Sequence, residues 1–102
     1  MTPDLRVAQT ILRQMGGGAR IALMVGAKDF VSGDKWVRFG WTARAANKAN
    51  RVEVILDPSD TYRVKFQRLY GNKLTDISTH TDVYAEDLKR LFENETKLYL
   101  SL

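Results

Sequence analysis

Cysteine is absent from this sequence, and histidine occurs only once, as His80. Without cysteine there is no disulfide scaffold, no thiol nucleophile and no cysteine-ligated zinc. His80 stands alone in STHTD, with no second histidine for a metal site or a nucleophile–base pair, and we interpret it as an exposed loop residue. The sequence nominates no catalytic residue, no metal ligand and no cofactor, so we expect a protein that is not an enzyme.

Long apolar runs are also missing. No window approaches the roughly 18 apolar residues that a membrane-spanning helix needs. The opening MTPDLRVAQT has no basic region followed by an apolar core, so we expect a cytoplasmic protein without a membrane partner. The 102 residues, 44% hydrophobic and 27% charged, are typical of a single globular domain covering residues 1–102.

Acidic residues are scarce in the first half of the chain. Residues 1–51 carry nine Lys and Arg against three Asp and Glu, a balance of +6. Residues 52–102 carry seven against nine, a balance of −2, and the two halves sum to the formal net charge of +4. This asymmetry is compatible with a polyanionic partner such as DNA or RNA.

An amphipathic helix is predicted at the N-terminus. Thr2, Pro3 and Asp4 supply an N-cap hydroxyl, a proline for the first turn and an acid for the positive end of the helix. The triple glycine at 16–18 is interpreted as the stop of this helix rather than a phosphate-cradling loop, because no strand precedes it and no Gly-Lys-Ser/Thr follows. The apolar residues that recur with a 3.6-residue period are Leu5, Ala8, Ile11, Leu12 and Met15.

The middle of the chain alternates with the period of two that is typical of β-strands. Residues 20–42 are predicted to form a β-hairpin that turns at Ser32-Gly33-Asp34, with a bulge or kink in VGAKDF. Further strands are predicted at 51–56 and 61–69, and a weaker one at 74–79. The residues expected to face the core are Ile21, Leu23, Val25, Val37, Phe39, Trp41, Val52, Val54, Leu56, Tyr62, Val64 and Phe66.

A second helix and a short tail are predicted to end the chain. Asp82 is expected to cap the helix, and its apolar face is formed by Tyr84, Leu88, Leu91 and Phe92. The closing LYLSL is expected to be a final strand or a docking tail, with Leu98, Leu100 and Leu102 on one side. The predicted fold class is α+β, with an antiparallel sheet of four to five strands packed on one face by an N-terminal and a C-terminal helix.

Two acidic residues in DPSD, Asp57 and Asp60, allow two interpretations. They could be paired carboxylates for acid–base chemistry or for a divalent cation. The same residues are what a tight turn between two strands requires, and we adopt the turn.

The face of the sheet opposite the helices is the candidate binding surface. Period two places Arg51, Glu53, Arg63, Lys65 and Gln67 on this face, and the hairpin adds Trp36 and Arg38. The segment Arg38–Arg51 has four cations and no acid in fourteen residues. Cations and an indole could hold a sugar-phosphate backbone and stack a base, although a solvated face and connection would have the same composition. The candidate nucleic-acid-binding residues are Trp36, Arg38, Arg44, Lys48, Arg51, Arg63 and Lys65.

Four stretches resemble a family of small uncharacterised proteins carried by bacteriophages and other mobile elements. They are GAKDFV at 26–31, VRFGW at 37–41, LDPSDTYRVKF at 56–66 and VYAEDLKRLFENET at 83–96. The chain departs from the family pattern at Lys97, where a glycine is expected. The resemblance implies a phage or an integrated element in a bacterium as the genomic setting, and it implies no activity, cofactor or site residue.

Two functions from different classes remain open at this stage. The first is a nucleic-acid-binding accessory protein with weak sequence preference, because no base-reading motif is present. The second is a protein-interaction module, such as an inhibitor of a host factor or a partner of another phage protein. An exposed sheet edge or an apolar patch around Phe30, Trp36 and Tyr99 would favour the second, and a homodimer is compatible with either.

Overall fold

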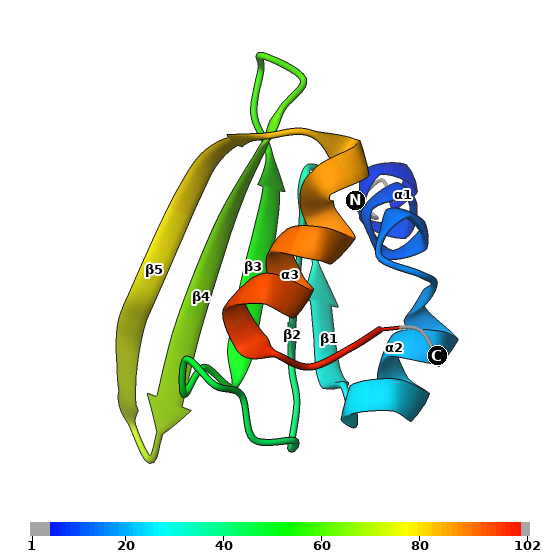
Figure 1. Ribbon diagram of the computed structural model, residues 1–102. Helices are drawn as coiled ribbons and strands as arrows, with labels where there is room; N and C mark the ends of the chain where they lie inside the picture. The colour runs from blue at the N-terminus through cyan, green and yellow to red at the C-terminus, as the bar shows by residue number, and fades with distance from the viewer. Residues whose placement is uncertain (1–4, 101–102) are drawn as a thin grey trace.

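The computed structural model describes residues 5–100 and shows one antiparallel sheet with its helices gathered on one side (Figure 1). Within these residues, no helix is long and apolar enough to cross a membrane. The expected helix start at Thr2-Pro3-Asp4 and the final Leu102 lie outside the described residues. The elements are α1 (Arg6–Gln14), α2 (Gly18–Val25), β1 (Lys28–Ser32), β2 (Trp36–Gly40), β3 (Arg51–Leu56), β4 (Tyr62–Tyr70), β5 (Lys73–Val83), a 3-10 turn η1 (Ala85–Asp87) and α3 (Leu88–Thr96).

The five strands form a simple meander. Their spatial order is β1-β2-β3-β4-β5, so each strand pairs with its neighbour in the sequence and every pair is antiparallel. α3 lies across one face, and α1 and α2 cover the β1 side of that same face (Figure 1). The predicted α+β fold, with a sheet packed on one face by helices from both ends of the chain, is confirmed.

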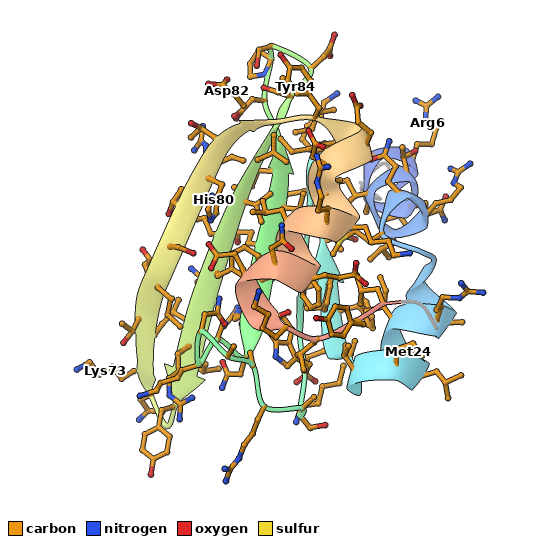
Figure 2. The ribbon with its side chains drawn as sticks, in the orientation of Figure 1. Arg6, Met24, Lys73, His80, Asp82 and Tyr84 are labelled. Carbon is orange, nitrogen blue, oxygen red and sulfur yellow. The ribbon has the colours of Figure 1, made fainter. Side chains whose placement is uncertain are left out.

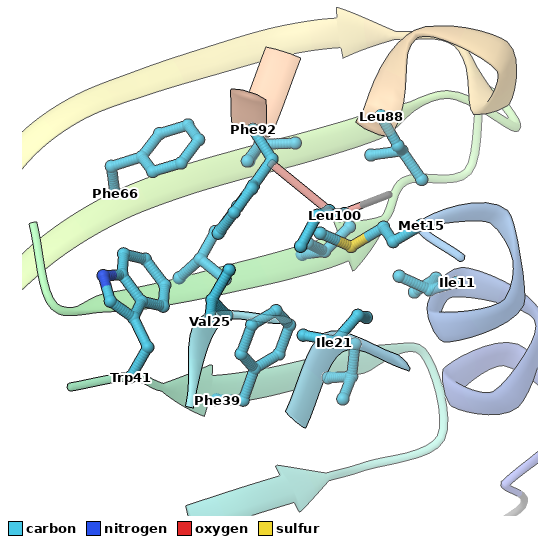
Figure 3. Packing of buried hydrophobic residues seen from close by; sticks show 14 of the residues in the cluster. Ile11, Met15, Ile21, Val25, Phe39, Trp41, Phe66, Leu88, Phe92 and Leu100 are labelled. Carbon is cyan, nitrogen blue, oxygen red and sulfur yellow. The ribbon is translucent and has the colours of Figure 1, made fainter. Parts of the chain in front are cut away.

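The core is an aromatic cluster between α3 and the sheet (Figure 3). Phe92 of α3 lies with its ring centroid 5.1 Å from that of Trp41, 6.2 Å from Phe66 and 6.3 Å from Phe39. These four side chains are at most 3% exposed. The strand residues predicted to face the core therefore do so in β2, β3 and β4, where Val37, Val52, Val54, Tyr62 and Val64 are also buried.

The prediction that the hairpin begins with a strand around residues 21–25 is wrong. Residues 18–25 form helix α2, in which Ile21 and Val25 are buried and Leu23 is 85% exposed. Positions 21 and 25 share a face in a strand and also in a helix, where they are one turn apart. Only the exposure of Leu23 therefore distinguishes the helix from the predicted strand. Gly26 ends the helix with φ 72°, and the hairpin partner of β2 is the later β1.

The bulge predicted in VGAKDF is confirmed. The register of β1 against β2 shifts between Lys28 and Val31, and Asp29 adopts the left-handed conformation with φ 57°. The extra residue in β1 lets Lys28 pair with Gly40 while Val31 pairs with Arg38. The bulge thus sets which side chains meet at this end of the sheet.

The last strand is longer than its sequence suggests, and the last helix starts later. β5 runs from Lys73 at one end to Val83 at the other, and Figure 2 shows Lys73 and Asp82 near its two ends. Asp82 therefore lies in the strand and does not cap a helix, and Tyr84 is 58% exposed rather than part of an apolar face. Thr75, Thr79 and Thr81 explain why the full length of β5 was not predicted. β-branched residues favour a strand, but threonine gives no apolar alternation.

The tail after α3 forms no strand in residues 97–100, and it packs on the core as a docking segment. Leu100 is fully buried, and its N–H donates to Glu93 at 2.8 Å. Lys97 ends the helix in the left-handed conformation with φ 59°. A glycine is usual at this position because a Cβ makes that conformation unfavourable.

Candidate functional site

The face opposite the helices carries alternating charges rather than a continuous basic surface. Strand pairing places Arg38 opposite Glu53, and Glu53 opposite Lys65. Arg63 forms an ion pair with Asp57 at 2.9 Å. The middle of the face is therefore partly neutralised, and the expected contribution of Arg63 and Lys65 to anion binding is reduced.

Asp57 and Asp60 form a turn, as the sequence predicts. The N–H of Asp60 donates to the carbonyl of Asp57 at 3.0 Å, and the N–H of Asp57 donates to Thr61 at 2.9 Å. Within residues 5–100, no group of His, Asp and Glu residues is placed to hold a metal ion.

Gln67 lies on the predicted face, opposite Arg51, but it is only 7% exposed there. Its amide nitrogen donates to Asp76 at 2.9 Å. The register of β4 against β5 shifts between Phe66 and Gln67, with one extra residue in β5. This bulge brings the carboxylate of Asp76 directly opposite Gln67.

A hollow of about 290 Å³ lies at one end of the face, around Gly40. Lys28 pairs with Gly40 on one side and Arg51 pairs with it on the other, while Arg38 lies two residues back along β2. All three cations line the hollow, together with one acid, Asp29. Gly40 also allows close packing, since a Cβ there would lie 3.1 Å from the carbonyl oxygen of Asn50.

Two of these cations repel each other. Burial lowers the pKa of Arg51 from its ordinary value, the neighbouring Arg38 guanidinium lowers it further, and Glu53 raises it in part. Within the described residues neither Arg38 nor Arg51 forms an ion pair. An anion bound beside Arg51 would stabilise the charged form of its guanidinium, because the anion offsets both the repulsion from Arg38 and the loss of water.

The loop 41–50, which joins β2 to β3, is held in place by hydrogen bonds. Trp41 donates to Asn50 at 3.1 Å across its base, and Ala46 donates to Thr96 of α3 at 2.7 Å. Arg44 and Lys48 are exposed on this loop. The backbone of this connection therefore has hydrogen-bond partners on α3 and β4.

The β4–β5 turn adds residues that the sequence analysis missed. Arg68 donates to the carbonyl of Lys48 at 3.0 Å, and its guanidinium lies over the ring of Tyr70, 5.9 Å from the centroid. Tyr70 is 76% exposed. Figure 1 shows this turn and the loop 41–50 at the same end of the sheet, and Lys73 extends from that end in Figure 2. We call the cations gathered here the basic end: Lys28, Arg38, Arg44, Lys48, Arg51, Arg68 and Lys73.

The sequence around the missed residues contains a pattern that could have identified them. Arg68, Tyr70 and Lys73 surround the turn glycine of RLYGNK, so two cations and an aromatic side chain flank a tight turn. The structure has this turn at Gly71-Asn72, between β4 and β5. Only the pairing of β3 with β4 shows that this turn lies at the same end of the sheet as Arg51, which is opposite Gln67.

Trp36 is less accessible for base stacking than the sequence suggested. Its indole packs against the turn glycine, since a Cβ at Gly33 would lie 2.3 Å from the ring nitrogen. The guanidinium of Arg38 lies over the ring, 5.7 Å from the centroid. A base could stack on Trp36 only after Arg38 moved away.

His80 is not an exposed loop residue, which corrects the expectation from STHTD. It lies in β5, and Nε2 contacts Glu95 of α3. The ring packs edge-on against Phe66, with centroids 6.0 Å apart, and Ser78 donates to the same Glu95 oxygen at 3.2 Å. This cluster joins the edge strand to α3.

No family model, curated protein or solved structure matches this chain. The fold and the site define the class only broadly, as a small α+β protein with an open sheet face and a basic end.

Proposed function

We propose that the protein is a non-enzymatic module that binds nucleic acid through its basic end. The observation that carries the proposal is the hollow at Gly40, where Lys28, Arg38 and Arg51 surround a position without a side chain. A phosphate is small enough for such a hollow, and guanidinium groups donate to it in a bidentate geometry.

The charges around the hollow support a polyanion over a single small anion. Arg44 and Lys48 are exposed on the adjacent loop, and Arg68 and Lys73 flank the neighbouring turn. Further cations at this end of the sheet, beyond those of the hollow, suit a ligand that carries several phosphates. Of the candidate residues, Arg38, Arg44, Lys48 and Arg51 belong to this proposal, whereas Trp36, Arg63 and Lys65 are secondary to it.

The test is a fluorescence-anisotropy titration of labelled single-stranded and double-stranded DNA and RNA over a range of salt concentrations. With roughly three to five phosphates contacted, log Kobs should fall linearly with log salt, with a slope of roughly −2 to −4. An oligonucleotide of the same sequence on an uncharged backbone is the control and should not bind. Absence of binding to all four nucleic acids at low salt, or binding that does not respond to salt, would contradict the proposal.

One observation favours a second candidate, a protein-interaction module that uses the outer edge of β5. This eleven-residue strand pairs only with β4 in the part of the chain that the structure describes. An open edge can accept a strand from a host protein, a phage protein or a second copy. Two register shifts against β4 oppose this use, because bulges twist an edge away from regular pairing.

A further inference from the structure

One acidic residue, Asp29, lines the hollow whose other charged residues are cations. These cations are Lys28, Arg38 and Arg51. Within residues 5–100 the carboxylate of Asp29 forms neither an ion pair nor a side-chain hydrogen bond, so it is not paired with any of the three. An unpaired carboxylate repels a phosphate and lowers the affinity of the hollow for it. Phosphate binding alone therefore does not account for Asp29.

The bulge in β1 holds Asp29 in this position. The register of β1 shifts between Lys28 and Val31, so two residues of β1 face one of β2. Phe30, one residue of the bulge, stacks on Phe39 with ring centroids 5.2 Å apart. Asp29, the other residue, has a left-handed φ of 57°, and its side chain lines the hollow. The bulge thus directs a carboxylate to the hollow while the neighbouring aromatic ring packs on the sheet.

The chemistry of a carboxylate limits what it can contact on a nucleic acid. It accepts hydrogen bonds and cannot donate them, so its partner must be a donor. Nucleic acids have two kinds of donor, the N–H groups of the bases and the 2′-hydroxyl of ribose. Only the 2′-hydroxyl lies next to a backbone phosphate at every nucleotide, whatever the base, and DNA lacks it. A phosphate held by Arg38 and Arg51 would therefore bring a 2′-hydroxyl close to the acid that lines the same hollow.

We infer that the hollow binds a ribonucleotide unit of RNA, with a backbone phosphate held by the three cations and the 2′-hydroxyl donating to Asp29. This inference rests on the proposed function and narrows its ligand from nucleic acid in general to RNA. The cations attract DNA and RNA alike. Asp29 repels the phosphate of both, and only RNA has the hydroxyl that offsets this repulsion. Asp29 is therefore the residue that determines specificity between RNA and DNA.

The test is an anisotropy titration with three labelled single strands of the same base sequence. They are RNA, DNA with uracil in place of thymine, and 2′-O-methyl RNA, which has no 2′-hydroxyl donor. The wild type should bind RNA roughly 10- to 150-fold more tightly than either of the other two, which is the usual contribution of a hydrogen bond to a charged group. The salt dependence should be the same for RNA and DNA, because the same cations contact the phosphates of both.

Asp29→Gly should abolish this preference. Glycine adopts the φ of Asp29 without strain, so the fold should be retained. Binding of DNA should become tighter, because the repulsion from the carboxylate is lost. Binding of RNA should fall relative to that of DNA, because the hydrogen bond is lost with the same group. The variant should therefore bind RNA no more tightly than DNA or 2′-O-methyl RNA.

Asp82→Gly is the matched control. Asp82 is exposed like Asp29 and has nearly the same backbone conformation, with φ 56°. It lies near the end of β5 opposite Lys73, away from the basic end (Figure 2). Each variant raises the formal net charge by one, from +4 to +5. Asp82→Gly should therefore show any effect of net charge alone and should keep the preference for RNA.

The outcomes separate this inference from the proposed function. Salt-dependent binding by a wild type that does not prefer RNA would overturn the inference and leave the proposed function standing. A preference for RNA that Asp29→Gly reduces no more than Asp82→Gly does would have the same consequence. Absence of binding to every oligonucleotide at low salt would overturn both.

Discussion

Phe92→Ala is expected to lower the free energy of unfolding by about 3–5 kcal/mol, which is the usual cost of removing a fully buried phenylalanine. Phe92 is 1% exposed, and its ring contacts those of Phe39, Trp41 and Phe66. Since a domain of this size is stable by only about 5–15 kcal/mol, much of the variant should be unfolded at physiological temperature. Urea denaturation followed by circular dichroism measures the change.

Phe30→Ala is the matched control for this prediction. Phe30 stacks on Phe39 with centroids 5.2 Å apart, but it is 40% exposed. Its removal should cost less than half as much as the removal of Phe92, because the remaining surface is already in water in the folded protein. Equal losses in the two variants would show that α3 is not packed on the sheet as described.

Reversing two charges of the hollow, in Arg38→Glu/Arg51→Glu, is expected to weaken nucleic-acid binding by at least about 100-fold. A hydrogen bond to a charged group contributes about 1.5–3 kcal/mol, so two lost contacts account for that factor before the new repulsion is counted. The effect on the free energy of unfolding should be small, since both side chains lie at the surface and repel each other in the wild type.

Arg13→Glu/Arg20→Glu is the control for net charge. Each double variant replaces two cations by two anions, so the formal net charge falls from +4 by 4 to 0 in both. Arg13 and Arg20 are exposed on α1 and α2, away from the hollow. The control should lose only the long-range part of the attraction, which salt screens. Equal loss in the two variants would mean that binding follows net charge and not the hollow.

The sequence predicts an element correctly where its pattern of hydrophobic residues fits a strand and cannot fit a helix, or the reverse. β3 and β4 alternate over six residues or more, with Val52, Val64 and Phe66 buried, and no helix fits that pattern. At 21–25 the alternation covers only five residues, and a helix buries Ile21 and Val25 equally well. Glycines on both sides, Gly16 and Gly17 before and Gly26 after, favour the helix. They let the chain enter and leave it within a few residues.

The site could be predicted only in part, because it depends on pairing between strands. Arg38 and Arg51 stand out in the sequence as cations in a stretch without acids. Lys28 reaches the same hollow only through the bulge at Asp29, which shifts the register of β1. Leu69 also lines the hollow, and the side chain of Asn50 holds its backbone there. Neither relation is visible as a spacing along the chain.

The central claim is that nucleic acid binds at the basic end, and an NMR titration of the ¹⁵N-labelled protein with a short single-stranded oligonucleotide tests it most directly. We expect the amide shifts to change at Lys28, Gly40, Arg51 and Leu69, and at their neighbours around the hollow. Amides of α1 and α2 should stay unchanged. A spectrum that does not change at all, or changes confined to the β5 edge or to the helices, would contradict the account.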